Sequence, residues 1–174
     1  MNYSEINRIA QDLIREHSLL ATPIKVEDIA RSMGIKVIPY PLEQNMSGLL
    51  VLEKNSAVIG YNQNEARVRR RFTVAHEIGH YVLHRDKSDR QVFVDKNFKA
   101  MFRSFESANE PTVAKLETEA NVFAACLLMP ETLVREEVGK TELDLGGEDS
   151  IRDLAKIFDV SSTAMHYRLL NLNL

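Results

Sequence analysis

The sequence predicts an α+β fold that is mostly helical, with a small antiparallel sheet early in the chain. Three short runs rich in β-branched and aromatic residues follow one another between residues 35 and 62. Longer segments on either side, such as residues 3–17 and 113–129, carry apolar residues at helical spacing. The 174 residues, 44% of them hydrophobic, suffice for one domain with a sizeable core.

Two helices are expected before the sheet. Residues 3–17 predict the first, because apolar side chains recur at helical spacing along them. The segment TPIKVEDIARSMGI predicts a second, shorter helix. Thr22 is its candidate N-cap, Pro23 falls in its first turn, and Gly34 is a typical stop signal.

The sheet is expected to contain about three antiparallel strands. Their sequences are IKVIPY (35–40), MSGLLVLE (46–53) and AVIGYN (57–62). The short segment KNS between the last two resembles a hairpin turn. RQVFVDKNF (90–98) is a candidate for a further strand at the sheet edge.

Helices are expected over most of the remaining chain. Residues 65–85 predict a long central helix, and residues 113–129 predict another that Pro130 should end, because the residue before a proline avoids the α region. Two short helices are predicted at residues 150–160 and 161–172.

Composition excludes several classes of protein. The formal net charge of −3 argues against a dedicated nucleic-acid binder, which usually has a basic excess. Cys126 is the single cysteine, so neither an intramolecular disulfide nor a cysteine-rich metal site is possible. Residues 1–17 lack the apolar stretch of a signal peptide, and no run approaches the roughly 20 apolar residues of a membrane span. We therefore expect a cytoplasmic protein without membrane contact.

The central helix carries the motif H-E-x-x-H, at His76, Glu77 and His80. Residues four apart share a helix face, so both imidazoles can reach one ion, and imidazole nitrogen suits zinc. Glu77 can then serve as the general base that activates water for attack on a peptide carbonyl. Phe72 and Leu83 share the face of the two histidines, so the motif should point inward, where unpartnered imidazoles would be costly.

A catalytic zinc site needs a third protein ligand. His84 cannot join His76 on one ion, because eight helical residues separate them by about 12 Å. We expect His84 to be a helix-end residue favoured by the C-terminal dipole, with a role in supporting a ligand or contacting substrate as the alternative. The helix at residues 113–129 offers Glu117 as the third ligand, with Asn121 one turn later to hydrogen-bond a ligating histidine.

Glu119 is the other candidate on that helix. It projects about 200° round the helix from Glu117, so the two glutamates cannot both face the metal. Both glutamates could also be solvated surface charges. Ala120 and Ala124 are small enough to let this helix approach the first one closely. The spacing therefore favours Glu117, and Glu119 and the absence of any ligating glutamate remain open alternatives.

These segments resemble the ImmA/IrrE metallopeptidase family. The resemblance rests on RRRFTVAHEIGHYVLHRD followed by ETEANVFAACLLMP, and the flanks at residues 26–50 and 151–172 are also similar. E-x-x-x-N is similar to the E-x-x-x-D of gluzincin peptidases, with asparagine in place of the aspartate. The resemblance implies a zincin-like domain with one Zn²⁺ per chain, held by His76, His80 and Glu117, and with Glu77 as catalytic base.

The family also implies a biological role. Its members are site-specific zinc endopeptidases that cleave a partner protein, usually a helix-turn-helix transcriptional repressor, and thereby relieve repression. The alternative for this chain is a non-catalytic, zinc-containing regulator that binds a protein partner or DNA.

The C-terminal segment predicts a helical hairpin that resembles a helix-turn-helix. We divide the chain into a metallopeptidase domain at residues 1–140 and this hairpin at 141–174, packed on the same domain. The turn is expected at residues 159–161, with Ser161 or Ser162 capping the second helix.

Few positive charges are available there for DNA. The hairpin's cations are Arg152, Lys156 and Arg168, and Asp153 and Asp159 oppose them. Phosphate contacts need more positive charge than this, which favours a hairpin that contacts protein over direct DNA binding. The basic cluster RVRRR (67–71) is expected to be a solvated helix face, with a site for an acidic substrate segment as the alternative.

Overall fold

The computed structural model describes residues 1–17, 20–43, 45–53, 56–85, 92–96, 111–140 and 148–174. Its helices are α1 (Tyr3–Glu16), α2 (Val26–Ser32), α3 (Arg67–His84), α5 (Pro111–Leu128), α6 (Glu131–Lys140), α7 (Glu148–Phe158) and α8 (Ser162–Asn171). Its strands are β1 (Ile35–Tyr40), β2 (Met46–Glu53), β3 (Ser56–Asn62) and β4 (Val92–Lys96). The predicted α+β, mostly helical class is confirmed.

The strands form one sheet in the order β1-β3-β2-β4. β2 pairs antiparallel with both β3 and β4, and the predicted edge strand is therefore present. The prediction of a wholly antiparallel sheet is wrong for β1, which pairs parallel with β3. The reason is topological: β3 folds back from β2 and takes the place between β2 and β1, so the first and third strands run the same way.

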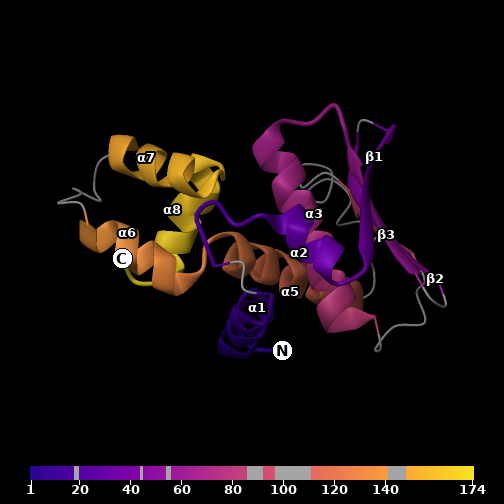
Figure 1. Ribbon diagram of the computed structural model, residues 1–174, viewed down its shortest axis with the longest axis horizontal. Coiled ribbons are helices and arrows are strands. Elements are labelled where there is room, and N and C mark those ends of the chain that lie inside the picture. The colour runs from indigo at the N-terminus through magenta and orange to yellow at the C-terminus, as the bar shows by residue number, and fades with distance from the viewer. Residues whose placement is uncertain (18–19, 44, 54–55, 86–91, 97–110, 141–147) are drawn as a thin grey trace.

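Helix α3 lies at the centre of the fold, between the sheet and α5 (Figure 1). Every residue from Thr73 to His80 is buried, as expected for a helix covered on several sides. Gly79 allows the close approach of α5, because a methyl group added there would lie 3.2 Å from Cα of Ala120. Ala120 and Ala124 are themselves fully buried, in keeping with their expected role as small contact residues.

The limits of two helices differ from those expected. α2 begins at Val26, and its N-cap is Lys25, not Thr22. Gly34 does follow the end of α2, with a φ of +75° that favours glycine. The sequence pattern predicts no helix over α6, yet α6 begins directly after Pro130. Pro130 ends α5 and also begins α6, because its carbonyl accepts a hydrogen bond from Val134 N at 3.0 Å.

The C-terminal helices α7 and α8 form the expected hairpin, which lies at the opposite end of the molecule from the sheet (Figure 1). Ser161 caps α8 by accepting a hydrogen bond from Ala164 N at 3.1 Å. Arg168 of α8 is buried and donates to the carbonyl of Met129 at 2.8 Å. These contacts attach α8 to α5, while the division of the chain at residue 140 stays a prediction.

None of the described helices combines the length and the apolar character that crossing a membrane would require.

Candidate metal centre

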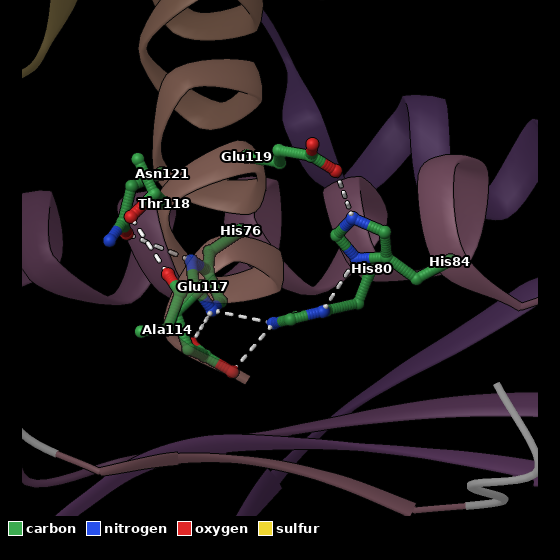
Figure 2. A network of polar contacts seen from close by, with 8 residues as sticks. All are labelled: His76, His80, His84, Ala114, Glu117, Thr118, Glu119 and Asn121. Carbon is green, nitrogen blue, oxygen red and sulfur yellow. Dashed lines mark hydrogen bonds and ion pairs between the residues drawn. The ribbon is translucent and has the colours of Figure 1, made fainter. Parts of the chain in front are cut away.

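Three side chains from two helices converge at the middle of α3 (Figure 2). The Nε2 atoms of His76 and His80 are 3.0 Å apart. Oε2 of Glu117, on α5, lies 3.2 Å from Nε2 of His76, and its Oε1 lies 3.4 Å from Nε2 of His80. The structure therefore brings together the three residues that the sequence proposes as ligands. Among the described residues, they are the group of histidines and carboxylates able to share one ion.

The separations suit a zinc ion. Nitrogen and oxygen ligands about 2.0–2.1 Å from a tetrahedral zinc are about 3.3 Å from one another. The separations of 3.0, 3.2 and 3.4 Å lie close to that value. Two imidazoles and one carboxylate are also a ligand set used by catalytic zinc. The residues present therefore fit the metal that the motif implies.

Asn121 sets the orientation of the first histidine. Its Oδ1 lies 3.0 Å from Nδ1 of His76. An amide oxygen can only accept, so Nδ1 must carry the proton. A neutral imidazole has one such proton, which leaves the lone pair of Nε2 facing the other two ligands. One turn of α5 separates Asn121 from Glu117, so the same helix supplies a ligand and the support of another.

Burial and neighbouring charge act against each other on the Glu117 carboxyl. Burial favours its neutral form, but hydrogen bonds and charge from His76 and His80 outweigh burial and lower its pKa to about 2. Burial lowers the pKa of His80, mainly because the charged imidazole loses its hydration. A carboxylate and a neutral imidazole are the forms that bind a metal.

His84 and Glu119 form a second polar contact beside the ligands. His84 ends α3 as expected, but it is fully buried, and its Nδ1 lies 3.1 Å from Nδ1 of His80. Its Nε2 lies 3.0 Å from Oε2 of Glu119. The other oxygen of Glu119 contacts the amino group of Met1. Glu119 thus points away from Glu117, as the 200° separation requires, and it is not a solvated charge.

Glu77 is fully buried beside this cluster and is not one of the converging ligands. Strand β2 passes close to it at Gly48. A methyl group on Gly48 would collide with Cγ2 of Thr73 and would lie 3.2 Å from Oε1 of Glu77. The sequence pattern did not single out Gly48, although a glycine inside a strand is a recognised signal of close backbone approach.

The basic cluster at the start of α3 is only in part the solvated face that was expected, because the Arg67 side chain is 71% exposed but that of Arg71 is 13% exposed. Arg71 is mostly buried and donates to the carbonyls of Ile24 at 2.9 Å and Asp159 at 3.0 Å. Arg67 binds the Asp159 carboxylate at 2.8 Å. Asp159 has a φ of +53°, a left-handed conformation that aspartate tolerates better than most residues. The cluster therefore attaches α3 to the turn between α7 and α8.

Comparisons with known proteins place the chain in a family. The model of the peptidase M78 family, described as an IrrE N-terminal-like domain, matches residues 30–170. A protein of Bacillus phage phi105, named uncharacterized immunity region protein 2, is 28% identical over 134 residues, which are 77% of this chain and 74% of the phage protein.

A solved structure named Mycobacterium tuberculosis transcriptional regulator shares the fold. Its TM-score is 0.66 at 16% sequence identity, and the match covers 95% of this chain. The chain spans 46% of the length of that protein.

Proposed function

This chain belongs to the peptidase M78 family, and we propose that it is a zinc-dependent, site-specific endopeptidase that cleaves a partner protein. The convergence of His76, His80 and Glu117 beside a buried Glu77 is the observation that carries this proposal. The family membership by itself points to metallopeptidase activity; the assignment of zinc and of each residue's role is ours.

Each residue of the site has its own role in the proposed reaction. His76, His80 and Glu117 would hold the ion, which when bound would polarise water and the scissile carbonyl. Glu77 takes the proton that the attacking water gives up and delivers it to the departing amine. Asn121 keeps His76 in the tautomer that presents Nε2.

We propose a helix-turn-helix transcriptional repressor as the substrate, whose cleavage relieves repression. The resemblance to the ImmA/IrrE family suggests this class. The phage relative's name, which refers to an immunity region, and the structural neighbour's name, a transcriptional regulator, are in keeping with it. Such a repressor works on cytoplasmic DNA, so the proposed reaction belongs in the cytoplasm.

The hairpin of α7 and α8 suits a protein partner better than DNA. Arg168 is buried, and the other two cations bind carboxylates of their own helix, Arg152 at Asp149 and Lys156 at Asp153, both at 2.8 Å. The exposed large hydrophobic side chains of the hairpin are Ile157, Tyr167 and Leu170. Paired charges beside exposed apolar groups are typical of a protein-contact surface.

The decisive experiment offers the protein a helix-turn-helix repressor from the same genome as substrate. Zinc-loaded wild type should cut it at one bond, detected by intact-mass spectrometry. Glu77→Gln should lower the cleavage rate by about 10³-fold or more, because the general base is lost, while its zinc content stays at one ion per chain.

Two outcomes would contradict the proposal. A wild-type protein that takes up no zinc would exclude a zinc peptidase. Relief of repression that persists in the Glu77→Gln variant would favour the alternative, a regulator that binds its partner without cutting it.

A further inference from the structure

His84 is a fully buried histidine that the proposed metal centre does not use as a ligand. Its ring lies between His80 and the carboxylate of Glu119 (Figure 2). Nδ1 of His84 is 3.1 Å from Nδ1 of His80, and Nε2 of His84 is 3.0 Å from Oε2 of Glu119. The three side chains therefore form a continuous hydrogen-bonded chain that ends at a proposed ligand.

The positions of the protons in this series of hydrogen bonds follow from the Glu119 carboxylate at one end of it. The Glu119 carboxylate can only accept, so Nε2 of His84 carries a proton. A neutral imidazole has no second proton, so Nδ1 of His84 accepts one from Nδ1 of His80. The lone pair of His80 is then on Nε2, the atom that faces Glu117 at 3.4 Å and His76 at 3.0 Å.

We propose that His84 and Glu119 are positioning residues that fix the tautomer and ring orientation of His80 and so raise the affinity of the site for zinc. The inference rests on the proposed zinc site, and it gives each ligating histidine its own support. Asn121 acts on His76 in one step from α5, and Glu119 acts on His80 in two steps through His84. Neither His84 nor Glu119 is one of the three converging ligands.

A purely structural role for His84 makes different predictions. If the contact only joined α3 to α5, its removal would weaken the fold and leave the ligand tautomer unchanged. If it positions His80, two variants of similar stability should differ in zinc affinity according to whether they can accept a proton from His80. His84→Gln can accept at its amide oxygen and donate at its amide nitrogen, whereas His84→Leu can do neither.

The first measurement is the zinc dissociation constant, obtained by competition with a chelating indicator. Loss of a hydrogen-bond partner of a ligand typically weakens metal binding by about 10–100-fold, and we expect a loss in this range for His84→Leu. His84→Gln should recover most of the affinity. Thr118→Val is the matched control, because it removes a 2.8 Å hydrogen bond from Thr118 to the carbonyl of Ala114, within α5, that leads to no ligand.

A double-mutant cycle tests whether the two residues act as one chain. Glu119→Ala, which removes the acceptor of the His84 proton, should lower zinc affinity in the wild-type background and have almost no further effect in the His84→Leu background.

The outcomes separate this inference from the proposed function. If the wild type binds zinc and His84→Leu binds it equally well, the positioning role is excluded and the metal site stands. If the wild type binds no zinc, both proposals fail.

Discussion

The two halves of α3 bring polar side chains into contact with other helices and turns in different ways. The second half places His76 and His80 one turn apart and brings them to Glu117 of α5. The first half directs Arg67 and Arg71 to Asp159, which is 92 and 88 residues away in the chain. The local pair of histidines is visible in the sequence as a motif, whereas the arginine contacts depend on two distant segments meeting.

The two halves of α3 therefore differ in role: one carries the candidate metal ligands, and the other joins α3 to other parts of the fold. The C-terminal half of α3 carries His76 and His80, which with Glu117 form a group that could hold a metal ion. The N-terminal half carries cations that bind backbone carbonyls and one carboxylate, and so attach the α7–α8 hairpin. Substitutions in the first half should therefore change stability, and those in the second half should change metal binding and catalysis.

The largest effect is expected at the third ligand. Glu117→Ala should lower zinc affinity by more than the roughly 100-fold attributed to an outer hydrogen-bond partner, because it removes a ligand atom. Glu119→Ala, two residues along the same helix, is the matched control and should lose less. Metal analysis after dialysis against a weak chelator checks both. A Glu117→Ala variant that still holds one zinc ion per chain would show that Glu117 is not the third ligand.

A smaller effect, on stability alone, is expected at Arg71. Arg71→Met keeps the apolar stem but removes the guanidinium that binds the carbonyls of Ile24 and Asp159. We expect the free energy of unfolding to fall by about 2–3 kcal/mol. Arg67→Met is the control, because the Arg67 side chain is 71% exposed and a surface ion pair contributes less than about 1 kcal/mol.

Urea unfolding of the two arginine variants measures the difference. Equal losses would show that the burial of Arg71 does not matter, and a loss of zinc in Arg71→Met would show that the two halves of α3 are not independent.

A substitution at Gly48 tests how closely α3 has to pack against strand β2. Gly48→Ala should cost about 1–3 kcal/mol, because the added methyl group collides with Thr73 and crowds Glu77. It should also slow cleavage. Gly60→Ala in β3 is the control, since a methyl group there would lie 3.4 Å from its nearest neighbours, Leu49 and Tyr40. Thermal unfolding and the cleavage rate are measured on both variants. Equal losses of stability and of cleavage rate in Gly48→Ala and Gly60→Ala would refute this prediction.

A last effect is a dependence of stability on pH. The Glu117 pKa of about 2 is lower than its ordinary value of 4.5, so its ionisation stabilises the folded, zinc-free protein. This stabilisation is complete above pH 4.5 and is lost as the pH falls towards 2. Glu117→Gln should therefore show a shallower fall in unfolding free energy over that range, measured with chelator present. Parallel curves for the two proteins would exclude this contribution.

Much of the fold was predictable because helices and strands leave local periodic signals. The long helices α1, α3 and α5 and the extents of β1, β2 and β3 follow from the apolar spacing. The start of α2 and the existence of α6 did not follow. Pro130 reads as the end of a helix, and nothing in the local pattern shows that its carbonyl also begins the next one.

The sequence by itself determined the chemistry that α3 can carry, because His76, Glu77 and His80 are fixed relative to one another by one turn of helix. It also favoured Glu117 over Glu119 as the third ligand, since the helical rotation keeps the two from facing the metal together, and it left open that neither glutamate is a ligand. Tertiary structure alone decided the rest. Which glutamate faces the histidines depends on how α5 packs, through Gly79 and Ala120, against α3.

The contacts around the candidate ligands likewise could not be predicted from the sequence pattern. His84 and Glu119 meet from two helices, and the sheet became mixed because β3 inserted beside β1. The physical reason is the same in each case. Local spacing fixes angles within one element, whereas contacts between elements depend on the packing of the whole core.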